Sequence, residues 1–427
     1  MKRMNHPLKS GKNIYITLIL IFSLCTSIDL RSQETEEVNF QHEGLTLFGT
    51  FLKPEGEGPF PTLIIGPGSG AIDRNATLLI TGPNAQCLYP DIYGSTLKPY
   101  KQLAEALADS GFAVLRYDKP EYTYPSNLGT VTFAKLWLPI ESAIDYVKTR
   151  SDVDTANITL IGHSESSYLI PYIAMNRSDV KNLISLAGPR APFDSLLTHQ
   201  IVSFAEMCNG DLETANAQAN QILAYYALIR SGNFSGSTPP LFGVPAAVWS
   251  DYLEVIDVVD ENYNSANLPT LFIGLDEDIN VPPIELERFQ NDVTVPPADF
   301  WSIPGLNHYM TPMDDPDISV ALTDTIIYWL RQFSTPTSIA DARISKTGLT
   351  AYPNPFDDVL FMEVDNYSPG IYEIRIIDDL GREVRKKEKY SSDNSWRLDN
   401  LGNISPGIYT LEFSNGKERG SIRIVKR

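Results

Sequence analysis

From Gln33 onward, short uninterrupted apolar runs alternate with amphipathic segments along most of the chain. Runs of four to eight apolar residues are typical of strands buried on both faces, and amphipathic segments between them are typical of covering helices. This alternation predicts an α/β fold with a mostly parallel sheet. The clearest helical stripe predicts a helix over Lys98–Ser110, ended by Gly111, with a buried face of Tyr100, Leu103, Ala104 and Leu107. The predicted strands are Leu45–Leu52, Thr62–Gly66, Ala113–Tyr117, Ile158–Gly162, Leu183–Ala187, Thr270–Gly274 and Phe300–Ile303.

Two further segments depart from this pattern. About 80 residues separate Ala187 from Leu268, which is too long for an ordinary connection. Their richness in Ala, Leu, Tyr and Asn predicts a helical insertion, a lid of about residues 191–268. After a Ser/Thr-rich linker at Thr335–Lys346, short strand-like runs separated by Gly, Asn, Asp and Pro predict a small all-β sandwich over residues 347–427. The runs are Val359–Val364, Tyr372–Ile377, Tyr409–Phe413 and Ser421–Val425.

The first 32 residues combine basic residues, an apolar run from Ile14 to Cys25 and a polar stretch, which predicts a secretory signal peptide cleaved near Ser32. The alternative is an uncleaved membrane anchor, but a bilayer core needs about 20 apolar residues. Cleavage would leave only Cys87 and Cys208, too few for a disulfide framework, so the fold is expected to depend on its core.

Charge and motif content narrow the partners. Residues 33–340 hold 15 Lys and Arg against 38 Asp and Glu, so we expect no nucleic-acid partner. The spacings C-x-x-C and H-E-x-x-H are absent from the sequence, and we expect no metal or cofactor.

The segment Ile158–Tyr168 carries the strongest catalytic motif. A β-branched run leads into Gly162-His-Ser-Glu-Ser166, where a nucleophile elbow would present the Ser164 hydroxyl above the sheet edge. Ser166 stands where glycine is usual, but it is still small. The alternative is a chance match, because a Gly-x-Ser turn alone is common. We expect Ser164 to be a nucleophile.

A serine hydroxyl needs a base, and histidine has a suitable pKa. The chain has five histidines, and His308 alone follows the last predicted strand of the sheet on a loop. We therefore predict that His308 is the base. A solvated loop histidine is the alternative.

The acid should follow the strand Thr270–Gly274, where Asp276, Glu277 and Asp278 form a cluster. A carboxylate would hold the histidine tautomer and stabilise its charged form. We prefer Asp278 to Asp276 because it stands just before the turn at Val281, and we expect Glu277 to face away. The alternative is that the three acids only solvate a loop.

The strand ending at Gly66 runs into a glycine loop, Gly66-Pro-Gly-Ser-Gly70, whose backbone N–H groups can approach an oxyanion. We predict an oxyanion hole formed by the N–H of Ser69, or of Gly70, together with that of Glu165. An ordinary glycine turn is the alternative. Asp73 and Arg74, which follow, are expected to form an internal ion pair that braces the loop.

With these residues in place, the first 340 positions resemble the α/β-hydrolase superfamily, and more closely its bacterial esterases of the dienelactone-hydrolase and prolyl-oligopeptidase-like branch. The similarity implies a carboxylic ester hydrolase with a small-molecule substrate. Where the family usually continues Arg-Gly-x-Gly after Asp118-Lys119, this chain has Pro120–Pro125, which puts the family's substrate preference in doubt. The segments that carry the resemblance are Gly68–Asn75, Lys98–Glu105, Ala113–Lys119, Gly162–Glu165 and Leu186–Pro189.

The last 80 or so residues resemble the sorting domain of the type IX secretion machinery of Bacteroidetes. That resemblance implies the secretion machinery as a partner, passage across both membranes, and release or attachment at the cell surface. From its residues alone, the same stretch would be a small β-module with a carbohydrate-binding role. The motifs are Tyr352–Pro355, Asp379–Val384, Pro406–Leu411 and Ile424–Arg427.

The sequence therefore predicts an exported serine hydrolase that cleaves carboxylic esters. A peptidase of the same superfamily and a non-catalytic surface binding protein on a hydrolase scaffold remain alternatives. Aromatic residues of the insertion would either wall a substrate pocket or form the core of the lid; they are Phe193, Tyr225, Tyr226, Phe234, Phe242 and Trp249.

Overall fold

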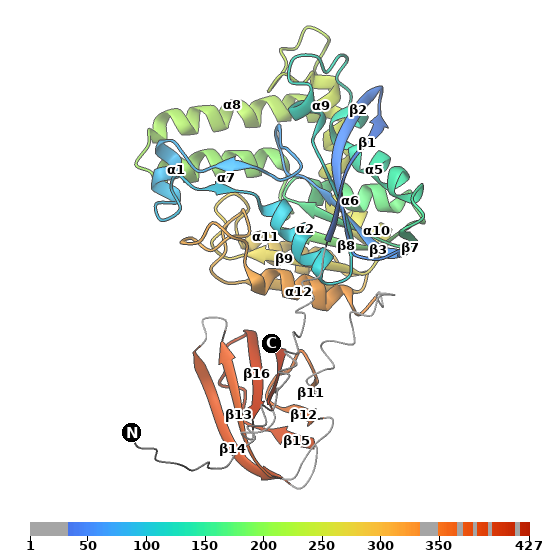
Figure 1. Cartoon of the computed structure of the whole chain (residues 1–427). Coiled ribbons are helices and arrows are strands. Elements are labelled where there is room, and N and C mark those ends of the chain that lie inside the picture. The colour runs from blue at the N-terminus through green and yellow to red at the C-terminus, as the bar shows by residue number, and fades with distance from the viewer. Residues whose placement is uncertain (1–32, 334–348, 365–369, 379–381, 392–394, 415–418) are drawn as a thin grey trace, which may run out of the picture. The chain divides into compact units, whose positions relative to one another are not determined.

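The structure is a computed structural model that describes residues 33–333, 349–364, 370–378, 382–391, 395–414 and 419–427. The predicted signal peptide and the predicted linker at Thr335–Lys346 lie outside these residues, and both remain predictions. The described parts form an α/β domain and a C-terminal β domain, each shown in Figure 1.

The α/β domain is organised around an eight-stranded sheet in the order β1-β2-β6-β3-β7-β8-β9-β10. The first two strands run antiparallel to their neighbours, and the others are parallel. The mostly parallel sheet predicted from the sequence is therefore confirmed. The strands are β1 (Gln33–His42), β2 (Leu45–Pro54), β3 (Phe60–Gly66), β6 (Ala113–Tyr117), β7 (Val153–His163), β8 (Val180–Leu186), β9 (Thr270–Leu275) and β10 (Ala298–Ile303).

Helices cover both faces of this sheet (Figure 1), because alternate strand residues point to opposite sides. On β3, Leu63 and Ile65 belong to one core, and Ile64 belongs to the other. The first core includes α2 (Pro99–Asp109) and α12 (Val320–Leu330). The second includes α4 (Phe133–Trp137), α5 (Pro139–Lys148), α6 (Ser166–Met175) and α11 (Ile284–Asp292). The predicted buried face of α2 is confirmed.

The long segment between β8 and β9 is the helical insertion that the sequence predicts. Its second helix begins with a cap, in which the Asp211 carboxylate accepts the N–H groups of Glu213 and Thr214. The helices are α7 (Phe193–Met207), α8 (Leu212–Arg230), α9 (Ala246–Ile256) and α10 (Val259–Ala266). Three shorter elements, β4 (Leu78–Leu79), α1 (Pro83–Leu88) and β5 (Thr96–Leu97), precede α2, and α3 (Pro120–Thr123) follows β6.

A disulfide joins Cys87 of α1 to Cys208 at the end of α7, with Cα atoms 5.7 Å apart. Two cysteines are too few for a disulfide framework, but they form one cross-link over 121 positions. The bond links the short segment before α2 to the first helix of the insertion.

The C-terminal domain consists of two antiparallel sheets, β11-β12-β15 and β14-β13-β16-β17. Buried residues of both sheets share one core that includes Leu360, Ile376, Trp396 and Leu411, so the predicted β sandwich is confirmed. The strands are β11 (Leu349–Tyr352), β12 (Leu360–Val364), β13 (Gly370–Asp378), β14 (Glu383–Ser391), β15 (Ser395–Leu398), β16 (Gly407–Ser414) and β17 (Arg419–Lys426).

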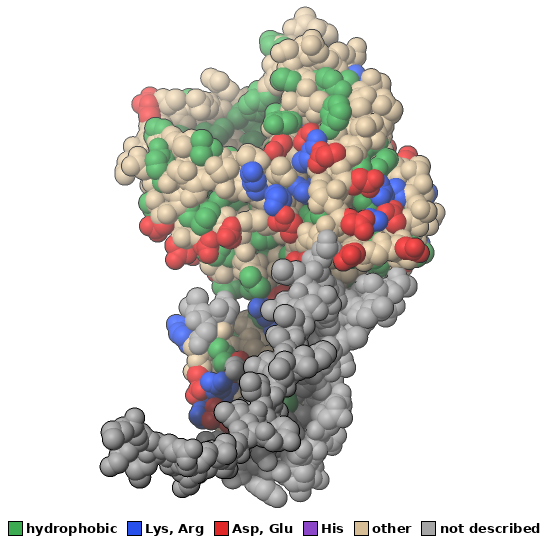
Figure 2. Space-filling model, viewed as in Figure 1, with side chains coloured by type: hydrophobic (Ala, Val, Ile, Leu, Met, Phe, Trp, Pro, Cys, Tyr) green, Lys and Arg blue, Asp and Glu red, His purple; other side chains and the backbone are tan. Residues whose placement is uncertain are grey.

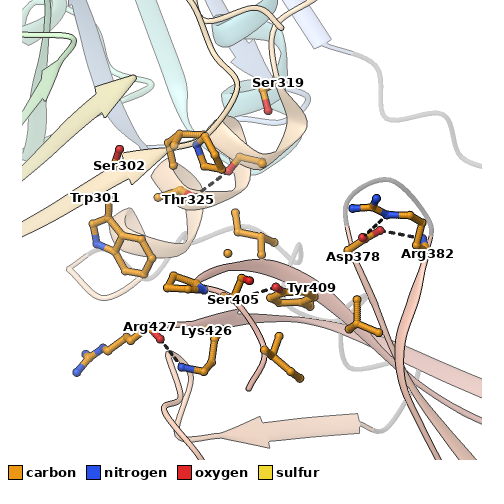
Figure 3. Close-up of a pocket in the computed structure, with 18 of the residues that line it drawn as sticks. Trp301, Ser302, Ser319, Thr325, Asp378, Arg382, Ser405, Tyr409, Lys426 and Arg427 are labelled. Atoms are coloured by element: carbon orange, nitrogen blue, oxygen red, sulfur yellow. Dashed lines mark hydrogen bonds and ion pairs between the residues drawn. The ribbon is translucent and has the colours of Figure 1, made fainter. Parts of the chain in front are cut away.

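Two local polar contacts lie at strand ends of this domain (Figure 3). The Tyr409 hydroxyl donates to the Ser405 carbonyl at 2.7 Å, just before β16. Arg382, just before β14, donates to the carboxylate of Asp378 at the end of β13 at 2.7 Å.

Among the residues that the structure describes, no helix has both the length and the apolar character needed to cross a membrane. Acidic side chains are scattered over the visible face of the α/β domain (Figure 2), as its excess of Asp and Glu predicts.

Candidate active site

Ser164 lies in a sharp turn between β7 and α6, with a backbone φ of 53°. A non-glycine residue in this left-handed region is strained, which is the backbone state of a nucleophile elbow. Gly162 makes the turn possible, because an added Cβ would lie 2.7 Å from the Ser166 carbonyl carbon. Ser166 fits its tight position, and its hydroxyl donates to the carbonyl of Pro67 in the glycine loop.

His308 and Asp278 are in contact, with 2.7 Å between His308 Nδ1 and Asp278 Oδ2. Asp278 has a fully buried side chain, and its other oxygen accepts the N–H groups of Asn280 and Val281, each at 2.8 Å. A carboxylate can only accept, so Nδ1 donates, and in the neutral ring this leaves the lone pair on Nε2. This is the tautomer that a general base requires.

The other two acids of the cluster point elsewhere. Asp276 is exposed and accepts the N–H of Gly305, and Glu277 is exposed as predicted. Asp278 is therefore the acid of this cluster that contacts His308.

The glycine loop runs directly over the elbow. A Cβ added to Gly68 would lie 3.4 Å from the Ser164 Cβ and 3.5 Å from His163 Nδ1. The Gly68 N–H is used in a bond to the Tyr100 hydroxyl at 2.9 Å, whereas Ser69 and Gly70, which follow it, are exposed. This placement keeps the N–H groups of Ser69 and Gly70 as candidate donors beside the serine.

The predicted ion pair between Asp73 and Arg74 is wrong. Arg74 donates to both oxygens of Asp118 at the end of β6, whereas Asp73 accepts the N–H groups of Asn75 and Thr77. The side chains of Asp73 and Arg74 therefore contact different groups and not each other. The loop is still braced, but by a long-range ion pair to β6.

A buried polar cluster surrounds Glu165, the residue after the elbow serine, and was not predicted from the sequence. Lys119 donates to the Glu165 carboxylate at 3.1 Å and to the Gly68 carbonyl at 3.2 Å. Trp137 Nε1 and the Tyr252 hydroxyl donate to the other carboxylate oxygen at 3.1 and 3.3 Å. The cluster ties the elbow to the glycine loop and to α9 of the insertion.

Charge neutralisation explains why this cluster tolerates burial. Burial alone would lower the pKa of Lys119, but the nearby carboxylates of Glu165 and Glu121 raise it, so the ammonium stays charged. Burial also raises the pKa of Glu121, against the effect of Lys119. Lys119 ends the segment Ala113–Lys119, one of those that resemble the α/β-hydrolases. A charged residue after a strand does not reveal from sequence alone which carboxylate it will contact.

His163, which directly precedes the elbow serine, is not among the site residues predicted from the sequence. Its ring lies 4.8 Å from that of His308, and its Nε2 is 3.0 Å from the His308 carbonyl oxygen. Burial, and then the neighbouring His308, lower the pKa of His163 to about 3, so its ring is neutral. The structure thus brings the predicted elbow and the predicted base together through His163.

Three of the six insertion aromatics have the core role. Phe193, Tyr226 and Trp249 are buried and pack against one another with ring centroids 5.4–6.3 Å apart, which is the lid-core role. Tyr225 and Phe234 are half-buried, and Phe242 is 64% exposed.

The strand order, with a serine elbow after the fifth strand of a mostly parallel sheet, defines the α/β-hydrolase fold. This confirms the fold that the sequence resemblance implies.

Comparison with known proteins adds two findings. Residues 350–427 match the family described as "Secretion system C-terminal sorting domain", which confirms that resemblance and indicates export to the cell surface or release. Over 167 residues, the chain is 30% identical to Esterase EstD of Thermotoga maritima, covering 38% of this chain and 36% of the relative. The chain thus spans about a third of that relative's length.

Solved structures are also similar. The acylaminoacyl peptidase of Pyrococcus horikoshii is 14% identical with a TM-score of 0.45, covering 74% of this chain and 44% of that chain. The dienelactone hydrolase of Anabaena variabilis is 14% identical with a TM-score of 0.43, covering 71% of this chain and 99% of that chain.

Proposed function

We propose that this chain is an exported serine hydrolase that cleaves carboxylic esters through an acyl-enzyme intermediate. One observation carries the proposal. A buried Asp278–His308 pair contacts His163, the residue directly before Ser164, and the elbow holds Ser164 in the left-handed region. A strained serine, an acid and a histidine base in this chain order are the arrangement that α/β-hydrolases use.

In the proposed reaction, Ser164 Oγ attacks the ester carbonyl carbon, and His308 Nε2 takes the hydroxyl proton. Asp278 keeps the proton of Nδ1 in place and stabilises the imidazolium. The tetrahedral oxyanion is held by the N–H of Glu165 and by the N–H of Ser69 or Gly70. The His308 proton then goes to the leaving alkoxide, which departs as the alcohol.

Deacylation repeats these steps with water. His308 takes a proton from the water that attacks the acyl carbon, and returns it to Ser164 Oγ as the acid leaves. The bonds that Lys119, Trp137 and Tyr252 make to the Glu165 carboxylate fix that residue. They would therefore hold its backbone N–H in a constant direction toward the oxyanion.

The ester specificity draws on the similarity to an esterase, and the alternative is a peptidase with the same machinery. The experiment measures turnover of p-nitrophenyl esters of increasing acyl length and of amino-acid p-nitroanilides, with Ser164→Ala as the control. We expect ester turnover that Ser164→Ala abolishes. Turnover of anilides in preference to esters would support the peptidase, and inertness of a folded protein toward both would support a binding protein.

We also propose that the C-terminal domain engages the type IX secretion machinery as a partner. The match of residues 350–427 to a sorting domain supports this proposal. A chain shortened before residue 349 should accumulate inside the cell envelope, whereas the full chain should reach the surface or the medium. Equal export of both chains would contradict it.

A further inference from the structure

A continuous series of hydrogen bonds joins three segments of the candidate site: the glycine loop, the elbow and the loop that carries His308. The Gly68 N–H lies 2.9 Å from the Tyr100 hydroxyl, which lies 2.8 Å from His163 Nδ1. His163 Nε2 lies 3.0 Å from the backbone carbonyl oxygen of His308. Tyr100 and His163 are both buried, with 2% and 5% of their surface exposed.

The chemistry of the two ends fixes the direction of every bond. A backbone carbonyl can only accept, so the proton of the His163 ring must be on Nε2. Nδ1 then carries a lone pair and accepts the Tyr100 O–H, and the Tyr100 oxygen accepts the Gly68 N–H. Donors and acceptors match along the whole series, provided that the His163 ring stays neutral. Its burial keeps it neutral.

The three connected positions are next to the three groups that the proposed reaction uses. Gly68 directly precedes Ser69, and His163 directly precedes Ser164. The carbonyl at the far end belongs to His308, the proposed base. The series therefore joins the glycine loop, the elbow and the histidine loop, which are far apart along the chain, through two side chains.

We propose that Tyr100 and His163 are positioning residues. They hold the glycine loop and the loop that carries His308 in fixed positions relative to Ser164. This inference rests on the proposed function. Neither side chain touches the substrate in this scheme; both act on where the reacting groups lie. Reacting groups must be held closely, and a misplacement of about 1 Å can cost about 100-fold in rate.

The test compares Tyr100→Phe with Tyr263→Phe. Tyr263 is an equally buried tyrosine whose hydroxyl donates to the Ser167 carbonyl at 2.9 Å, outside the series. Competent sites are counted by exhaustive labelling with a fluorophosphonate, so that kcat refers to folded enzyme alone. We expect Tyr100→Phe to lower kcat about 10- to 100-fold with KM within about threefold, because positioning acts mainly on the transition state. Tyr263→Phe should keep kcat within about threefold of wild type.

A second pair of variants tests His163 at constant volume. Glutamine keeps an N–H that can reach the His308 carbonyl, whereas methionine removes both polar atoms. We expect His163→Gln to retain about tenfold more kcat than His163→Met.

The outcomes separate the two proposals. A kcat per labelled site within threefold of wild type for Tyr100→Phe, or equal losses in Tyr100→Phe and Tyr263→Phe, would overturn the positioning role and leave the hydrolase assignment intact. If Tyr100→Phe does not fold, equal kcat in His163→Gln and His163→Met would overturn it as well. A folded wild type that neither turns over esters nor accepts the label would overturn both proposals.

Discussion

Replacing Asp278 by asparagine tests the acid–base pair most sharply. The Asp278 carboxylate accepts three bonds, from His308 Nδ1 at 2.7 Å and from the N–H groups of Asn280 and Val281 at 2.8 Å each. An asparagine oxygen can keep the two backbone bonds, which leaves its NH₂ facing Nδ1. His308 must then move its proton to Nε2 and cannot accept the serine proton.

The magnitude follows from the lost tautomer. In a serine-protease triad, the same change lowers kcat by about 10⁴. We expect a loss of about 10³ to 10⁴ in kcat, which is about 4 to 5.5 kcal/mol at 1.36 kcal/mol per factor of ten. KM should change little, because the carboxylate does not reach the substrate.

The assay is steady-state hydrolysis of p-nitrophenyl acetate between pH 7 and 9. Asp276→Asn is the matched control, because Asp276 is exposed and bonds to Gly305 instead of to His308. It should keep kcat within about threefold. A loss of less than tenfold in Asp278→Asn, or equal losses in both variants, would refute the role of Asp278.

Three further predictions concern stability. Gly188→Ala should lower the free energy of unfolding by about 1 to 3 kcal/mol, because its Cβ would lie 2.3 Å from Ser185 Oγ. The control Gly236→Ala should not lower it, because nothing lies within 4 Å of the added Cβ. Equal urea midpoints for the two variants would contradict this prediction. Reduction of Cys87–Cys208 should cost about 2 to 4 kcal/mol, seen as a lower Tm in dithiothreitol; an unchanged Tm would count against a closed disulfide. His163 has a pKa of about 3 in the fold, against about 6.5 when unfolded, so the unfolded chain binds more protons between these values. The free energy of unfolding should therefore fall as the pH drops below 6.5, by at most about 1.4 kcal/mol per pH unit. It should fall less in His163→Gln. Equal slopes of this free energy against pH in the wild type and the variant would contradict a buried neutral His163 ring.

Strands buried on both faces could be predicted from the sequence because their apolar runs are continuous, as at Ile158–Gly162 and Thr270–Gly274. The strand β1 could not, because it lies at the sheet edge, begins with exposed acidic residues, and then alternates its few buried positions with exposed amide side chains. An edge strand shows one solvated side, so it has no continuous apolar run.

The candidate site, too, could be predicted only in part. Ser164 and His308 stand out because motif and order point to them, and the preference for Asp278 over Asp276 came from its position before a turn. The Asp278–His308 contact itself is a property of the fold.

Contacts between distant segments gave no local signal. In the sequence, Tyr100 is one more apolar position on the buried face of a predicted helix. In the structure, its hydroxyl contacts both Gly68 and His163. The partner of Lys119 and the pairing of Cys87 with Cys208 are equally invisible in the sequence, because each joins segments that only folding brings together.

The most direct measurement of the central claim is covalent labelling of the folded protein with a fluorophosphonate, followed by intact-mass analysis and peptide mapping. We predict one adduct per chain, on the peptide that contains Ser164, and no adduct in Ser164→Ala. A folded wild type without an adduct, or with its adduct on another residue, would contradict the assignment of Ser164 as the nucleophile.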